Sequence, residues 1–131
     1  MLRMNGLKPL ALRAVTVRMA STKTAPKKYV TIEGEELANK MKSLKDANWE
    51  LSKDELFINK VYRFGGFNDA WAFLTQVALY SNARGHHPKI VNDYDAVTLT
   101  MHTHDTKSLT TLDLSMAAMF DKLGKTYKQY P

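Results

Sequence analysis

The sequence predicts an α+β domain: a four-stranded antiparallel sheet with three helices packed on one face, in the order α-β-β-α-β-β-α. Three stretches carry apolar residues at helical spacing, and between them lie segments rich in β-branched or alternating residues. The chain has 131 residues, of which 44% are hydrophobic and 24% charged, as in one folded domain with one core. It has no cysteine, which excludes disulfides and thiolate chemistry.

The first predicted helix covers residues 35–47, and its first turn carries two acidic residues that suit the helix dipole. Its apolar stripe consists of Leu37, Met41 and Leu44. A strand is expected over residues 56–64, and residues 49–51 can pair with it as a hairpin. The more apolar face of this strand, which Lys60 interrupts, consists of Leu56, Ile58, Tyr62 and Phe64.

The second predicted helix covers residues 67–82, after a break at Gly65 and Gly66. Its broad apolar face consists of Phe67, Ala70, Trp71, Phe73, Leu74, Val77, Ala78 and Tyr80. The helical spacing favours core packing for these aromatic side chains over a ligand cage. The width of the face predicts burial against the sheet, with a partner subunit as a further cover. Gly85 is expected to end the helix with positive φ.

The second strand pair is expected over residues 89–93 and 96–104, with a turn at Tyr94 and Asp95. Alternation places Val97, Leu99, Met101 and Thr103 on one face of the last strand, and Thr98, Thr100, His102 and His104 on the other. The third helix is expected over residues 109–127. Thr110 followed by Asp113 gives a capping-box pattern at its start.

The positive charge of the chain is concentrated in residues 1–28, which hold seven basic residues and no acidic one. The chain as a whole has 19 basic and 13 acidic residues, so the remainder has 19 − 7 = 12 basic and 13 acidic residues, a net charge of −1. The folded part therefore offers no electrostatic reason to bind nucleic acid directly. No apolar run is long enough to span a membrane.

Residues 1–28 have the composition of an amphipathic mitochondrial presequence, because basic residues punctuate short apolar pieces and acidic residues are absent. We therefore expect a disordered targeting segment or linker over residues 1–28, followed by a folded domain over residues 29–131. Mitochondrial localisation follows from this expectation. An untargeted tail on a cytoplasmic protein is the alternative.

All four histidines lie within nineteen residues: His86, His87, His102 and His104. Imidazole has an unperturbed pKa of about 6.5, so such a cluster predicts a site that moves protons or binds a metal. A metal site would use His102 and His104 from one strand face with a third ligand from the preceding pair. No cysteine or carboxylate completes an obvious ligand set, so metal binding is the weaker alternative.

The stretch from His86 to Asp113 has the spacing HHP-x5-Y-x9-H-x8-D, which includes Tyr94 and His104. This spacing resembles the signature of the pterin-4a-carbinolamine dehydratase family. The run from Phe67 to Leu79, the segment LTTLDLSMA and the pair Trp49-Glu50 are similar to the same family. The resemblance covers about residues 35–124.

The resemblance implies a hydro-lyase that converts 4a-hydroxytetrahydrobiopterin into quinonoid dihydrobiopterin and water, in the recycling of tetrahydrobiopterin after an aromatic amino acid hydroxylase. It implies His86, His87 and His104 as the catalytic histidines, without a cofactor or metal. We expect His87 and His104 to transfer the protons and His86 to hold or polarise the substrate. The residues expected to bind the pterin are Gly85, His86, His87, His102, Thr103, His104, Asp105, Asp113 and Trp49. Core packing is the alternative for Trp49, and a helix cap alone is the alternative for Asp113.

Three positions depart from the family pattern: Asn82 replaces an acidic residue, Ile90 an aromatic one and His102 a small polar one. The loss of the carboxylate at position 82 removes any increase of a histidine pKa that it would cause. The resemblance also implies a homodimer or homotetramer. A non-catalytic interaction module of the same fold is the alternative function, because some members serve as dimerisation cofactors of a homeodomain transcription factor.

Overall fold

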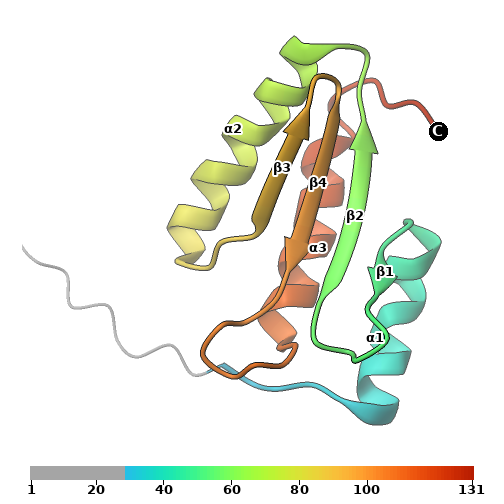
Figure 1. The fold of residues 1–131 in the computed structure, drawn as a ribbon, viewed down its shortest axis with the longest axis vertical. Coiled ribbons are helices and arrows are strands. Elements are labelled where there is room, and N and C mark those ends of the chain that lie inside the picture. The colour runs from blue at the N-terminus through green and yellow to red at the C-terminus, as the bar shows by residue number, and fades with distance from the viewer. Residues whose placement is uncertain (1–28) are drawn as a thin grey trace, which may run out of the picture.

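The computed structural model describes residues 29–131 and confirms the predicted α+β architecture (Figure 1). The predicted segment over residues 1–28 lies outside the described residues. The order of elements is α1 Gly34–Asp46, β1 Glu50–Leu51, β2 Ile58–Arg63, α2 Phe67–Arg84, β3 Lys89–Asp93, β4 Ala96–Met101 and α3 Thr111–Gly124. No helix among residues 29–131 is long and apolar enough to cross a bilayer.

The four strands form one open antiparallel sheet in the order β1-β2-β4-β3. Figure 1 shows α3 running behind the sheet, between α1 and α2, so the three helices form a layer on one face. The side chains of Val97, Leu99 and Met101 on β4 are fully buried under this layer, as the alternation predicts. On the opposite face, Val61 and Val91 are 48% and 49% exposed.

Strand β2 carries the predicted apolar face, and Lys60 interrupts it as expected. Ile58, Tyr62 and Phe64 are buried, whereas Leu56 is 43% exposed because the strand begins only at Ile58. The preceding turn is held by the Ser52 hydroxyl, which accepts backbone hydrogen bonds from Leu56 and Phe57. These bonds keep Leu56 and Phe57 in the turn, whereas the sequence predicted them as the first two residues of the strand.

The last strand and the last helix are both shorter than predicted. Strand β4 ends at Met101, where its partner Ile58 begins β2, so the next residues have no ladder partner on that side. Helix α3 ends at Gly124 instead of residue 127. A Cβ added at Gly124 would lie 3.3 Å from the Tyr62 ring and 3.5 Å from the Phe73 ring. The helix therefore ends at a position where the backbone is packed closely against these two rings.

The broad apolar face of α2 is only partly used in the single chain. Ala70, Phe73, Leu74 and Val77 are buried in the core, as predicted. Phe67 and Trp71 are 46% and 50% exposed, so core packing does not account for these two rings within one chain. The Phe67 ring packs against the Trp71 ring and stacks on Tyr94, which is itself 67% exposed.

Candidate active site

A cavity of about 340 Å³ lies where the turn after α2, the chain after β4 and the N-terminal segment meet. It is lined by Tyr29, Gly85, His86, His87, Thr103, His104 and Asp105. The structure thus brings together the three predicted catalytic histidines from segments that are far apart in the sequence. Three further residues predicted to bind substrate, Gly85, Thr103 and Asp105, line the same cavity.

The turn after α2 fixes the positions of the adjacent histidines. Gly85 adopts the left-handed conformation with φ of 56°, as predicted, and its N–H donates to the carbonyl of Asn82. The N–H of His86 donates to the carbonyl of Ser81 at 3.1 Å. This helix end buries the His86 side chain and leaves His87 exposed, although both line the cavity.

Asp113 anchors the buried side of the site. Its Oδ1 lies 2.6 Å from Nε2 of His86, and its Oδ2 accepts a hydrogen bond from the Thr103 hydroxyl at 2.7 Å. The N–H of Thr110 donates to Oδ2 at 3.0 Å, within the predicted capping box at the start of α3. Asp113 is therefore both a helix cap and the partner of His86, but the cavity is lined by His86 and not by Asp113.

The surroundings of Asp113 favour its ionised form. Burial alone raises the pKa of this carboxyl, but the hydrogen bonds from His86, Thr103 and Thr110 outweigh burial and leave the pKa below its ordinary value. The carboxylate contacts Nε2 of His86 and thereby fixes the orientation of the ring.

His102 does not line the cavity, but it stacks on a residue that does. The ring centroids of His102 and His104 are 4.1 Å apart with an interplanar angle of 26°. Burial lowers the pKa of His102, and the positive charge of a protonated His104 lowers it further. His102 therefore adjoins the site through its ring contact with His104.

Tyr29 is a lining residue that the sequence reasoning missed. The backbone of its segment pairs with the start of α3, since the N–H of Thr111 donates to Val30 and the N–H of Ile32 donates to Leu109. This pairing brings the Tyr29 ring to 5.9 Å from the His86 ring, measured between centroids. The only sequence signal is an aromatic residue at the start of the folded region, which is too weak to place it.

The structure does not bring Trp49 to this cavity. Its side chain is 1% exposed in the core, and Nε1 donates to Oδ2 of Asp121 at 3.0 Å. Trp49 lines a separate surface depression with residues of α1 and β1. Within one chain Trp49 is therefore packed in the core, as the alternative expected, and its role as a substrate contact stays a prediction.

The residues described by the structure hold no group of three His, Cys, Asp or Glu side chains arranged to bind a metal ion. Neither His86 nor His87 is therefore placed as a third ligand for a metal ion held by His102 and His104. What the geometry offers is a set of imidazoles around one cavity, one of them fixed by a buried carboxylate.

The fold and the site define a small α+β protein with a cavity lined by three histidines. The family model described as pterin 4 alpha carbinolamine dehydratase matches residues 30–123. The chain therefore belongs to the pterin 4 alpha carbinolamine dehydratase family, as the sequence motif indicated.

Similar proteins agree with this membership. The chain is 42% identical over 74 residues to a putative pterin-4-alpha-carbinolamine dehydratase of Sinorhizobium fredii, covering 56% of this chain and 70% of the relative. It is 34% identical over 97 residues to one of Burkholderia pseudomallei, covering 74% and 94%.

Two solved structures share the fold. One is a transcriptional coactivator/pterin dehydratase from Brucella melitensis, with a TM-score of 0.67 and 28% identity, covering 72% of this chain and 98% of that chain. The other is a pterin dehydratase-like protein identified as a RuBisCO assembly factor in the alpha-carboxysome, with a TM-score of 0.52 and 25% identity, covering 58% and 88%. The family supports dehydratase activity, while these titles include other roles.

Proposed function

We propose that this protein dehydrates 4a-hydroxytetrahydrobiopterin to quinonoid dihydrobiopterin by general acid–base catalysis from histidines. The observation that carries the proposal is the cavity in which His86, His87 and His104 meet, in a chain that belongs to the dehydratase family. A cavity of about 340 Å³ is within the range of small-molecule sites.

The reaction needs two proton transfers and no change of oxidation state. An acid donates a proton to the 4a-hydroxyl as its bond to carbon breaks, and the oxygen leaves as water. A base removes a proton from a ring N–H, and the electrons of that bond form the C=N bond of the product. One proton is given and one is taken, so the pair of imidazoles ends with the same total charge. Each such group contributes about 10²–10⁴-fold to the rate.

We assign the two proton transfers to His87 and His104, and the holding of substrate to His86. His87 and His104 are exposed at the cavity, where they can exchange protons with water between turnovers. His86 is 7% exposed and is bound to Asp113, so its ring is fixed and suited to binding and polarising a substrate. Which of His87 and His104 is the acid is an outcome of the experiment below.

The deciding experiment measures dehydration of freshly formed 4a-hydroxytetrahydrobiopterin by the wild type and by the variants His87→Ala and His104→Ala. We expect kcat to fall about 10²-fold or more in each variant. The two variants should remove opposite limbs of the pH–rate profile, which separates acid from base. The control is Lys122→Ala, which changes an exposed residue in the last turn of α3. Wild-type rates in both histidine variants would refute the proposal.

We further propose that the reaction serves tetrahydrobiopterin recycling after an aromatic amino acid hydroxylase. The substrate is the carbinolamine that such an oxygenation leaves on the pterin. In a coupled assay with a hydroxylase and a reductase for quinonoid dihydropterin, limiting pterin should support more hydroxylation when the wild-type protein is present. The His87→Ala variant is the matched control, and it should give no increase.

We also propose a homodimer or homotetramer that covers the exposed apolar side of α2. Phe67, Trp71 and Leu79 are 46%, 50% and 69% exposed. Contact with a second copy would remove this apolar surface from water, which lowers the free energy. Leu79→Glu should lower the mass measured by light scattering, whereas Ala118→Glu on an exposed position of α3 should not. An unchanged mass in Leu79→Glu would exclude this surface.

A second candidate function is an interaction module, which the two structural neighbours' titles favour. Under this alternative the exposed side of α2 binds another protein and the histidine pocket is dispensable. A deletion strain complemented by His87→Ala as well as by the wild type would favour the interaction module over the enzyme.

We propose mitochondrial localisation on the composition of residues 1–28 alone. A fluorescent fusion of the full chain should reach mitochondria, and a fusion of residues 29–131 should stay in the cytoplasm. The same distribution for both fusions would refute targeting by this segment.

A further inference from the structure

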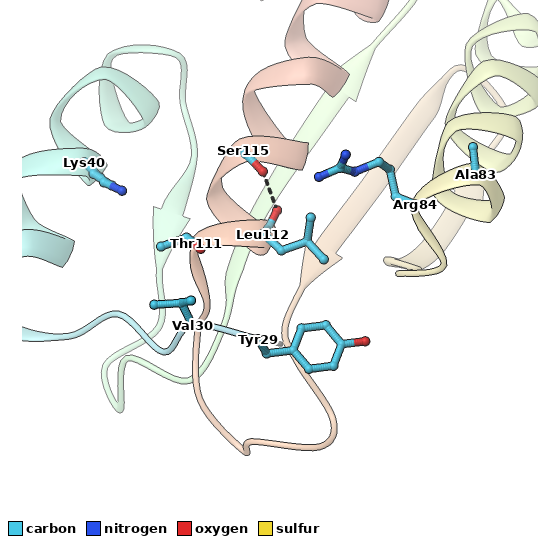
Figure 2. A pocket seen from close by; sticks show the side chains of 8 residues that line it. All are labelled: Tyr29, Val30, Lys40, Ala83, Arg84, Thr111, Leu112 and Ser115. Carbon is cyan, nitrogen blue, oxygen red and sulfur yellow. Dashed lines mark hydrogen bonds between the residues drawn. The ribbon is translucent and has the colours of Figure 1, made fainter. Parts of the chain in front are cut away.

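A second and larger cavity, of about 650 Å³, adjoins the histidine pocket. It is an open groove across the first turns of α3, bounded by α1, by the end of α2 and by the N-terminal segment (Figure 2). Tyr29 lines both the groove and the histidine pocket, so the two are neighbours that share one aromatic ring. Tyr29 is therefore the boundary that a ligand reaching from one cavity into the other would pass.

The groove has the chemistry of an anion site. Lys40 reaches it from α1 on one side of α3, and Arg84 reaches it from the last turn of α2 on the other (Figure 2). Tyr29, Thr111 and Ser115 add hydroxyl groups, and no carboxylate of residues 29–131 is among the lining residues of the groove. Guanidinium and ammonium groups bind phosphate or carboxylate through charge-assisted hydrogen bonds.

Neighbouring interactions leave this chemistry in place. Lys40 pairs with Glu36 at 3.4 Å, but both side chains are about half exposed or more, and such pairs contribute little and exchange readily. Arg84 also interacts with another group of the chain, and a guanidinium has five N–H donors to share. The Ser115 hydroxyl donates to the carbonyl of Leu112 at 3.0 Å and keeps lone pairs that can accept from a donor.

The covalent chain links the groove to the catalytic histidines. Arg84 directly precedes Gly85 and His86, so one turn carries the guanidinium to the groove and the imidazole to the pocket. Thr111 directly follows Thr110, the N-cap of α3, which is bonded to Asp113 and through it to His86. The backbones of Arg84 and His86 are thereby held two positions apart at the end of α2.

We propose that this groove binds the side chain of the pterin substrate and gives a pterin whose side chain carries an anionic group, phosphate or carboxylate, an advantage over the neutral biopterin. The inference rests on the proposed function, because it assumes that the bicyclic ring lies among the histidines. A pterin is a flat ring with one flexible substituent, and the ring in the smaller cavity directs the substituent past Tyr29 into the groove. The Tyr29 ring then separates the reacting end of the substrate from its charged end.

The first test measures binding of oxidised pterins, which cannot react, by titration calorimetry at low salt. One ligand has a neutral hydroxylated side chain, one a phosphorylated side chain and one a side chain ending in a carboxylate. We expect the anionic ligands to bind about tenfold more tightly than the neutral one, with the advantage shrinking as salt rises. Phosphate carries more charge, so a stronger gain for it than for carboxylate assigns the site to phosphate; the reverse order assigns it to carboxylate.

The matched variants are Arg84→Gln and Lys40→Ala, each of which removes one cation from the groove. Each should reduce the advantage of the anionic ligand about fivefold, whereas Lys42→Ala, an exposed lysine of α1 outside the groove, should not. Equal affinity for all three ligands in the wild type, or an advantage that survives both variants, would overturn the inference.

The kinetic test separates this inference from the proposed function. Dehydration is measured for carbinolamines with neutral and anionic side chains, and the ratio of their kcat/KM values is compared between wild type and Arg84→Gln. If kcat/KM is higher for the anionic substrate in the wild type, and this preference is smaller in Arg84→Gln, anion binding by the groove is supported. Turnover of both substrates at equal kcat/KM overturns the groove and leaves the dehydratase standing. No turnover of either overturns the proposed function, and calorimetry then decides the groove alone.

Discussion

The carboxylate of Asp113 contacts the imidazole of His86 at 2.6 Å across 27 positions of sequence, and it does so while capping α3. One side chain thus joins the end of α2 to the start of α3. The Thr103 hydroxyl adds the chain after β4 to the same carboxylate. The end of α2, the chain after β4 and the start of α3 are therefore joined at Asp113.

The first prediction concerns the removal of this carboxylate. Asp113→Ala leaves donors from His86, Thr103 and Thr110 without an acceptor in a fully buried place, and it removes the helix cap. We expect a loss of about 3 kcal/mol or more in unfolding free energy, measured by urea denaturation. Asp113→Asn keeps the shape and one acceptor, so it should lose less. Thr103→Val removes only one donor, and its expected cost is about 1 kcal/mol.

The second prediction concerns the pH dependence of stability. The pKa of Asp113 lies below its ordinary value of 3.8, because the hydrogen bonds it accepts outweigh its burial. The unfolded chain therefore binds this proton first as pH falls. The stabilisation is fully present above pH 3.8 and is lost as pH falls below that value through the folded pKa. Urea midpoints measured from pH 6 downward should drop more steeply in the wild type than in Asp113→Asn. Parallel curves would contradict it.

The third prediction concerns a polar cluster on the buried face of the sheet, remote from the histidine cavity. Asp121 accepts hydrogen bonds from Lys60 at 2.6 Å, Tyr62 at 2.8 Å and Trp49 at 3.0 Å. Burial and the Asp121 charge raise the pKa of Tyr62, so its hydroxyl stays a donor at every working pH. Asp121→Ala leaves the Lys60 charge largely buried without a partner and should cost about 3–5 kcal/mol of unfolding free energy.

A double variant tests the cause of that loss. In Asp121→Leu combined with Lys60→Met, both charges are absent, and the part of the lost stability that is due to the unpaired Lys60 charge should return, while the Tyr62 hydroxyl and the Trp49 N–H still lack their acceptor. The dehydration rate per folded molecule should stay at the wild-type value in the double variant, because none of its residues lines the histidine cavity. A double variant as unstable as Asp121→Ala would show that the ion pair is not the cause.

The sequence predicted the features that depend on local pattern. The inward side chains of β4, the left-handed Gly85 and the capping box at Thr110 and Asp113 all follow from spacing, and the structure confirms them. Features that depend on distant partners were not predictable. Trp49 lies in the core because Asp121, which is 72 positions away, accepts its N–H. Tyr29 reaches the cavity because its segment pairs with the start of α3.

The last prediction concerns His102, where the family pattern has a small polar residue. Its ring stacks on His104 at 4.1 Å between centroids. Burial lowers the pKa of His102 below 6.5, the charges of His104, His86 and Lys89 lower it further, and Asp113 opposes them. When pH falls below 6.5, the unfolded chain therefore binds the His102 proton before the folded chain does. Because of His102, the unfolding free energy should decrease as pH falls from 6.5 towards the pKa of His102 in the folded chain. Above neutrality His102 should add nothing to the pH dependence of stability.

The measurement compares wild type with His102→Ser in urea at intervals between pH 8 and pH 5. The two should show the same change of midpoint with pH above neutrality, and the variant should lose less stability than the wild type below pH 6.5. Thr98→Ser, at a half-buried position of β4, is the control and should follow the wild type. In an NMR titration, His104→Ser should raise the pKa of His102, because it removes a positive charge stacked against the ring. An unchanged His102 titration in that variant would show that the stacked pair is not electrostatically coupled.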